Sequence, residues 1–160
     1  MSQPEIIRAT ADQAAALTAL MHASSAYQGD YASILDGYAV TPSYIDANPT
    51  FTAVAHGEVL GFYALLADPP ELDILFVADA AQGLGIGGRL VAHMLGQARA
   101  RGIRSVRVVS HPPALPFYVR MGARRTGTIP PKPPKVAWER PELRFDVPPY
   151  HAEPEPAATC

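Results

Sequence analysis

The sequence predicts a single α/β (α+β) domain with a mixed central sheet of about six or seven strands and helices on both faces. Its 160 residues are 48% hydrophobic, which is enough to fill one core without a metal or a disulfide. β-rich runs alternate with helical patterns along the chain. A strand, a helix and a second strand over 71–110 predict a parallel crossover, whereas hairpin signals predict antiparallel neighbours. We expect this domain to span residues 1–147.

Local signals define the elements of the first half. Thr10 and Gln13 fit a capping box, so a helix is expected to begin there. Thr41 followed by Pro42 predicts the start of a second, short helix. Gly57 separates two β-rich runs, as in a hairpin. The elements expected are, in order, a strand over 5–9, a helix to about 25, helical turns and loop over 27–40, a helix over 42–48, and strands over 51–56 and 59–67.

The second half predicts the crossover and a last pair of strands. A glycine-rich turn leads into a long helix, and Gly102 is placed to end it as a C-cap. The elements expected are a strand over 71–77, a helix over 85–101, a strand over 103–110, a short helix over 114–121, and strands over 123–128 and 138–147. Residues 148–160, rich in Pro, Ala and Glu, are predicted to form a disordered tail.

Composition excludes several classes of protein. The lone Cys160 cannot form an internal disulfide, and no Cys or His cluster has the spacing of a metal site, so no metal is expected. No apolar run approaches the roughly 20 residues that span a bilayer. The N-terminus lacks the regions of a signal peptide. We therefore expect a cytoplasmic protein that does not bind membranes, and the sequence allows a homodimer.

Charge is strongly segregated along the chain. Residues 1–79 hold ten acidic side chains and one basic one, Arg8, whereas residues 80–138 hold ten basic side chains and no acidic one. Surface of one sign repels itself, so this pattern indicates that the basic half meets an anion and the acidic half meets a cation.

The glycine-rich turn is a candidate anion site. It follows a predicted strand and opens a predicted helix, where free backbone N–H groups and the helix dipole converge. Its residues are Gln82, Gly83, Leu84, Gly85, Ile86, Gly87, Gly88 and Arg89. A dinucleotide-binding fingerprint also fits Gly83-x-Gly85-x-x-Gly88, but it needs an acidic residue about 20 positions later. No acid occurs before Glu139, which argues against that alternative.

Three segments together resemble the GCN5-related N-acetyltransferase (GNAT) family. The turn has the pattern Gln82-x-x-Gly85-x-Gly87, in a strand–turn–helix context. A later segment, Phe117-Tyr118-Val-Arg-Met-Gly-Ala, is similar to a second motif of the family, and Leu75-Phe76-Val77 resembles the end of its bulged fourth strand. The element order matches over most of 5–147, and the motifs lie within 71–123.

This resemblance implies a binding site for acetyl-coenzyme A (acetyl-CoA) as co-substrate. Backbone N–H groups over 82–87 would hold the diphosphate, with Gly88 beside them and Arg89 as a complementary charge. The fourth and fifth strands would splay apart to admit the pantetheine arm. N–H groups near Phe76 and Val77 would hold that arm and polarise the thioester carbonyl.

The resemblance also implies roles in proton transfer. Tyr118, next to Phe117 of the cofactor site, would protonate the departing thiolate as a general acid. Glu71 is the leading candidate for the base, with Asp73 on the same strand face and a water chain as alternatives. His111 stands where relatives often have an asparagine that contacts the cofactor.

The function expected is transfer of an acetyl group from acetyl-CoA to a primary amine of a small molecule or peptide. Tyr27, Tyr31 and Tyr38 are candidate walls of the acceptor pocket, with Asp73 on the substrate side. One alternative is a non-catalytic domain that senses acyl-CoA. A nucleic-acid-binding protein is disfavoured, because no aromatic residues are interleaved with the basic stretch.

Overall fold

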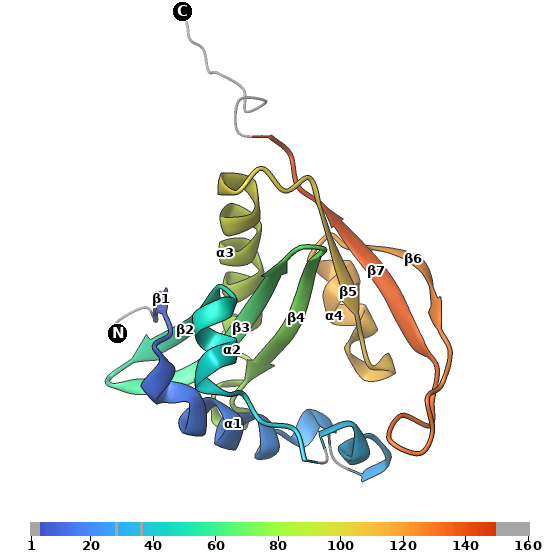
Figure 1. Cartoon of the computed structure of the whole chain (residues 1–160), viewed down its shortest axis with the longest axis horizontal. Coiled ribbons are helices and arrows are strands. Elements are labelled where there is room, and N and C mark those ends of the chain that lie inside the picture. Colours follow the sequence, from blue (N-terminus) through green and yellow to red (C-terminus); the bar gives the residue numbers. More distant parts are fainter. Residues whose placement is uncertain (1–3, 28, 36, 150–160) are drawn as a thin grey trace, which may run out of the picture.

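The fold is a seven-stranded mixed sheet in the order β1-β2-β3-β4-β5-β7-β6 (Figure 1), which confirms the predicted fold class. The computed structural model describes residues 4–27, 29–35 and 37–149, so most of the predicted tail, residues 150–160, lies outside the described residues. The strands are β1 (Glu5–Arg8), β2 (Thr50–Ala55), β3 (Glu58–Ala67), β4 (Pro70–Val77), β5 (Ser105–Val109), β6 (Arg124–Ile129) and β7 (Arg140–Asp146).

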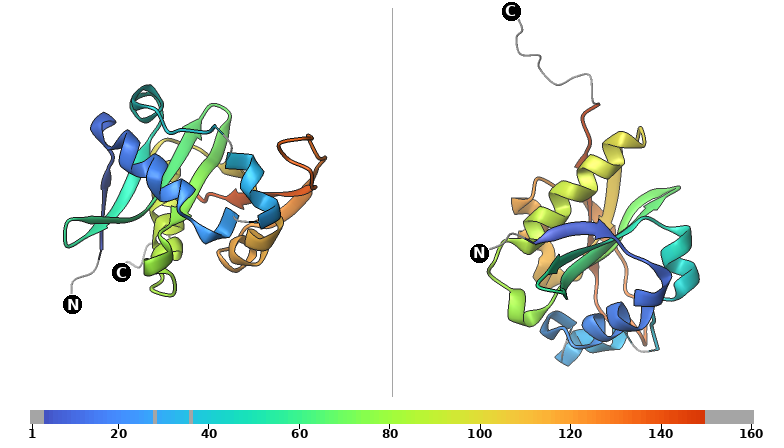
Figure 2. Two further views of the ribbon diagram at one scale, coloured as in Figure 1. Left: turned by 90° about the horizontal axis from the view of Figure 1, so that it is seen from below. Right: turned by 90° about the vertical axis from the view of Figure 1, so that its left-hand side faces the viewer.

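Helices cover both faces of the sheet (Figure 2). The α-helices are α1 (Ala14–His22), α2 (Pro42–Ala47), α3 (Ile86–Ala100) and α4 (Leu115–Arg120). Short 3-10 turns join them: η1 (Ala11–Gln13), η2 (Ser25–Tyr27), η3 (Gly29–Leu35), η4 (Asp79–Ala81) and η5 (Pro112–Ala114). The helices α1 and α2 pack on one face, and α3 and α4 pack on the other. No helix in the described part of the chain is long and apolar enough to cross a bilayer.

Local capping explains where the helices begin. The Thr10 amide donates to the Gln13 side chain at 3.0 Å, and the Thr41 hydroxyl accepts from the Tyr44 amide at 3.1 Å. The first predicted helix is shorter than expected, because the Thr10 and Gln13 capping box begins the 3-10 turn η1 and α1 begins only at Ala14. It ends at His22, and Ser25 starts a separate 3-10 turn instead of a last helical turn.

Two apolar layers enclose the sheet. Leu90 and Met94 of α3 are fully buried on one face, and Leu17, Met21 and Ile45 from α1 and α2 are buried on the other. Burying each such side chain contributes roughly 1.5–3 kcal/mol. The central strands β3 and β4 are therefore packed against apolar side chains on both faces.

The strands β4 and β5 splay apart. They run parallel, and Glu71 and Arg107 form the only paired position between them in the described structure. Beyond that point β4 continues alone on this side, although it stays paired with β3 on the other. A bulge at Asp73 breaks the β3–β4 register, since Leu65 faces Leu72 and Ala64 faces Ile74. Both features were implied by the family resemblance, and the strand pairing confirms them.

A histidine on α3 is expected to make stability depend on pH. His93 Nδ1 lies 2.8 Å from the Tyr63 hydroxyl, and burial lowers the pKa of this imidazole. The folded state therefore binds fewer protons than the unfolded state, so stability is highest above the ordinary histidine pKa of about 6.5 and falls as pH decreases below it. Urea unfolding at pH 7.5 and pH 5.5 measures this loss.

The matched variants are His93→Asn and His56→Asn. Asparagine at 93 keeps an acceptor for Tyr63 and does not titrate, so most of the loss between the two pH values should disappear. His56 is exposed at a backbone φ of 54°, which asparagine tolerates, and its replacement should leave the loss unchanged. An equal loss in His93→Asn and wild type would contradict this account.

Candidate active site

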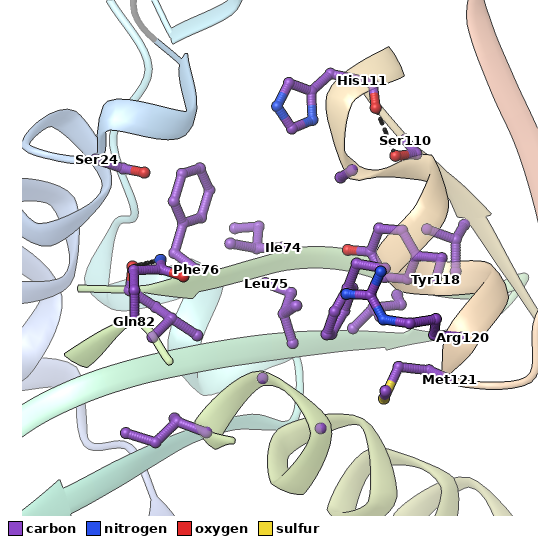
Figure 3. Close-up of a pocket in the computed structure, with 18 of the residues that line it drawn as sticks. Ser24, Ile74, Leu75, Phe76, Gln82, Ser110, His111, Tyr118, Arg120 and Met121 are labelled. Carbon is purple, nitrogen blue, oxygen red and sulfur yellow. Dashed lines mark hydrogen bonds between the residues drawn. The ribbon is translucent and has the colours of Figure 1, made fainter. Parts of the chain in front are cut away.

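The splayed strands open onto a cavity of about 500 Å³ (Figure 3). Its walls are β4 from Leu72 to Val77, the loop around Gln82–Gly88, the end of β5 with residues 108–111, and α4. These four segments all lie between residues 72 and 121 of the chain. The cavity lies where β4 and β5 separate. Its walls include the three segments that carry the sequence motifs, namely the end of β4, the glycine-rich turn and α4.

The loop before α3 presents unused backbone donors. Gly83 and Gly85 have φ values of 83° and 78°, which suit glycine and turn the chain sharply into the helix. The first amide bonded within the helix belongs to Arg89, which donates to the Gly85 carbonyl at 3.1 Å. Among the described residues, none accepts a hydrogen bond from the amides of 83–88. Its N–H groups are positively polarised, and we call this segment the diphosphate loop after the ligand that the family resemblance implies for it.

Close packing brings the diphosphate loop against α4. A Cβ on Gly87 would lie 3.1 Å from the Phe117 ring, so only glycine fits there without displacing that ring. Phe117 in turn packs edge-on against Tyr118, with ring centroids 5.1 Å apart. The lack of a side chain at Gly87 therefore lets the start of α3 approach the element that carries Tyr118.

The free edge of β4 also offers backbone donors. The Ala78 amide donates to the Leu60 carbonyl at 2.8 Å, and antiparallel pairs alternate between bonded and non-bonded positions. Phe76, opposite Phe62, is therefore bonded to β3, whereas the N–H groups of Leu75 and Val77 face the gap. The resemblance implied that the amides of Phe76 and Val77 hold the pantetheine arm. In the structure the Val77 amide faces the gap, but the second amide that faces it belongs to Leu75 and not to Phe76.

Tyr118 lies in the wall opposite β4, with its hydroxyl directed into the cavity (Figure 3). Only 7% of the residue is exposed. Burial raises the pKa of this phenol, and the nearby Tyr27 phenol raises it further. Tyr118 therefore keeps its proton at neutral pH, which is the state that a general acid needs.

The cavity has one negative and one positive wall residue among the described positions. Asp73 lies at the bulge of β4, and its Oδ2 accepts a hydrogen bond from the Tyr44 hydroxyl at 2.5 Å. Arg120 lies on α4 near Tyr118 and Met121 (Figure 3). Arg89, the predicted complement to phosphate, does not line the cavity, and its Nη2 donates to the Pro4 carbonyl at 2.9 Å.

Glu71 lies at the vertex of the splayed strands and does not line the cavity. Its Oε1 is 3.4 Å from Nη1 of Arg107, whose Nε also pairs with Glu142 of β7. Burial raises the pKa of Glu71, and the Arg107 guanidinium opposes that rise. This bridge connects β4 to β5 and β7, so the geometry gives Glu71 a structural contact at the point where pairing ends. No group of three or more metal-ligating side chains occurs in the described part of the chain.

Aromatic residues form the wall on the α1 side. Tyr27 lines the cavity and stacks on His111, with ring centroids 4.1 Å apart, and burial raises the pKa of Tyr27 to about 12. Tyr31 contacts the same His111 edge-on at 5.6 Å but does not line the cavity. Tyr38 lies outside the lining too, although burial, and after it the nearby Asp73 carboxylate, raise the pKa of its phenol. Ser24 completes this wall.

Sequence reasoning missed Tyr44, Trp138 and Arg120. Arg120 lies two residues after Tyr118, inside the second motif, so the motif itself could have indicated it. Tyr44 reaches Asp73 across 29 residues. Trp138 contacts Tyr31 from the loop between β6 and β7, with centroids 4.8 Å apart. No local pattern marks either of these two contacts.

Leu84 of the diphosphate loop is 67% exposed and does not line the cavity.

A family model described as an acetyltransferase (GNAT) domain matches residues 37–129, which is more than half of the chain. The chain belongs to the GNAT acetyltransferase family. The match includes β4, the diphosphate loop and α4, and it confirms the family resemblance. Acetyl-CoA is the co-substrate of GNAT enzymes. A search of curated proteins finds no match for this GNAT chain.

Solved GNAT structures share the fold along nearly the whole chain. A GCN5-related N-acetyltransferase from Rhodopseudomonas palustris is 21% identical, with a TM-score of 0.75 over 92% of this chain and 98% of that one. An acetyltransferase from Bacillus cereus, described as an IAA acetyltransferase, is 21% identical, with a TM-score of 0.69 over 90% and 99%. A GNAT acetyltransferase from Elizabethkingia anophelis, solved with acetyl-CoA bound, is 18% identical, with a TM-score of 0.67 over 92% and 100%.

Proposed function

We propose that this GNAT enzyme transfers an acetyl group from acetyl-CoA to a primary amine of a small molecule or peptide. One observation carries the proposal: the unused amides of the diphosphate loop open into the same cavity as Tyr118 and Asp73. An anion cradle, a proton donor and a carboxylate thus share one space.

The residues present fit acetyl-CoA. The amides over 83–88 would hold the diphosphate at the helix N-terminus, with the Arg120 guanidinium adding positive charge. The amides of Leu75 and Val77 would hold the pantetheine arm along the free edge of β4. Bound acetyl-CoA supplies an activated acyl group, and the protein supplies orientation and proton transfer.

Asp73 is the carboxylate that we assign to the amine. It lines the cavity, whereas Glu71, the base favoured by the sequence, is paired with Arg107 outside the lining. The Tyr44 hydroxyl fixes one Asp73 oxygen and leaves the other for an incoming ammonium group. Asp73 then accepts a proton from that group, so that the neutral amine attacks.

Tyr118 acts on the other side of the reaction. As the carbon–sulfur bond breaks, its buried phenol donates a proton to the departing sulfur, and the further proton that the acylated nitrogen loses restores the phenol through solvent. The charge pattern of the sequence supports an acidic side for the amine and a basic side for the cofactor. Asp73 comes from the acidic N-terminal half, and Arg120 comes from the basic C-terminal half.

The experiment that tests this function is thiol release from acetyl-CoA with a panel of acceptors. The panel pairs amino acids, polyamines and short peptides with alcohols of matched size. We expect release with at least one primary amine and none with its alcohol analogue. Acylation of alcohols alone would contradict the amine assignment. Tight acetyl-CoA binding without release across the panel would identify a sensor domain instead.

A further inference from the structure

A carboxylate beside the diphosphate loop holds the turn that carries Tyr27. The turn η4 runs directly into the loop, and Asp79 is its first residue. The Ser25 amide donates to the two carboxylate oxygens of Asp79 at 3.1 Å and 3.2 Å, and the Ser25 hydroxyl donates at 3.1 Å. These three bonds join segments 54 residues apart. They connect the cofactor side of the cavity to its acceptor side.

The segment anchored in this way spans the acceptor side of the cavity. We call η2 and η3 together the strap. Tyr27 of the strap lines the cavity between Phe76 and His111, with ring centroids 5.2 Å and 4.1 Å away. At its other end, the Ser33 hydroxyl donates to the Lys135 carbonyl at 2.6 Å. The strap is therefore bonded to η4 at one end and to the loop between β6 and β7 at the other.

The hydrogen bonds between Asp79 and Ser25 are charge-assisted, but they are open to solvent. A carboxylate that accepts from the first amide of a helical turn is a cap, and charge-assisted bonds of this kind are strong for their size. Both residues are exposed, so water competes for the bonds and the contact is easily broken. The turn η4 continues directly into the diphosphate loop, so a ligand held by the loop acts next to the residue that bonds Ser25.

We propose that Asp79 is a positioning residue that couples occupancy of the diphosphate loop to the placement of Tyr27 in the acceptor wall. The inference rests on the proposed function, because acetyl-CoA is the ligand that occupies the loop. Coupling between two sites is reciprocal, so the ordered strap raises acetyl-CoA affinity by the same factor as acetyl-CoA orders the strap. Acetyl-CoA thus prepares the acceptor wall before the amine enters.

Hydrogen exchange followed by mass spectrometry tests the coupling, with acetyl-CoA as the probe. In the wild type, saturating acetyl-CoA is expected to slow exchange about fivefold in peptides carrying the strap. In Asp79→Ala, the peptides of the diphosphate loop should still be protected at saturation, whereas the strap should slow less than twofold. Asp79→Asn keeps one acceptor oxygen for the Ser25 amide and should restore part of the effect.

Asp146→Ala is the matched control. Asp146 is also an exposed carboxylate with two charge-assisted bonds to another strand, 3.1 Å each from Arg124, but it lies away from the cavity. Its removal should leave the strap response at the wild-type value. A spectroscopic readout is independent of exchange: Trp138 is the sole tryptophan and contacts Tyr31 of the strap, so acetyl-CoA should change its emission in the wild type and not in Asp79→Ala.

Two results would overturn the inference while leaving the function intact. One is equal protection of the strap in Asp79→Ala and wild type at saturation, which would assign the effect to direct contact with acetyl-CoA. The other is protection of the diphosphate loop in the wild type with no change in the strap. Absence of acetyl-CoA binding to the wild type by calorimetry would overturn the proposed function and this inference together.

Discussion

Tyr118→Phe is expected to lower the turnover number about 100- to 1,000-fold, which lies within the range for loss of a general acid. Acetyl-CoA affinity should stay within about threefold of the wild type. The substitution removes one oxygen and keeps the ring that packs on Phe117 and Phe145, so the cavity wall should persist. Steady-state kinetics with the amine found in the acceptor screen, together with calorimetry of acetyl-CoA, separate the two effects.

Tyr63→Phe is the control for this prediction. Tyr63 is also buried, and its hydroxyl contacts His93 on α3 rather than the cavity. Loss of that hydroxyl should lower stability by about 1 kcal/mol and leave turnover unchanged. Wild-type turnover in Tyr118→Phe, measured beside a stable Tyr63→Phe, would remove Tyr118 from the mechanism.

Gly85→Glu is expected to weaken acetyl-CoA binding at least about 100-fold, or about 2.7 kcal/mol. Gly85 has a φ of 78°, where a side chain is strained, and it is the N-cap of α3. A carboxylate there would compete with the diphosphate for the free amides and repel it. Titration calorimetry measures the loss directly.

Gly102→Glu makes the same change at the opposite end of α3. Gly102 has a φ of 75°, and a Cβ at either glycine would meet nothing within 4 Å. The two variants therefore share charge, strain and open surroundings and differ in their distance from the diphosphate loop. Unchanged affinity in Gly85→Glu, or an equal loss in Gly102→Glu, would show that the loop is not the binding site.

Much of the fold could be predicted because its signals are local. The capping groups of η1 and α2 lie within three residues of each other, and Gly102 follows the end of α3 close to where it is expected. The crossover from β4 through α3 to β5 follows from element order alone. Boundaries were less accurate where long-range contacts intervene. Asp79 caps Ser25 from 54 residues away, and that contact belongs to a turn separate from α1.

The assignment of side chains around the cavity depends on register, which the sequence does not reveal. Glu71 and Asp73 share a strand face, as expected, but only the bulge and the Arg107 bridge distinguish the cavity residue from the structural one. Likewise Arg89 and Arg120 both lie near glycine motifs. The folded chain directs Arg89 to Pro4 and brings Arg120 to the cavity.

The central claim is that the amides of the diphosphate loop bind the diphosphate of acetyl-CoA. The most direct test compares acetyl-CoA with S-acetylpantetheine, which keeps the thioester and arm but lacks the diphosphate and nucleotide. Calorimetry should give at least about 100-fold tighter binding of acetyl-CoA to the wild type, and the ratio should fall below about tenfold in Gly85→Glu. Equal affinities in the wild type, or a ratio that Gly85→Glu leaves intact, would contradict the account.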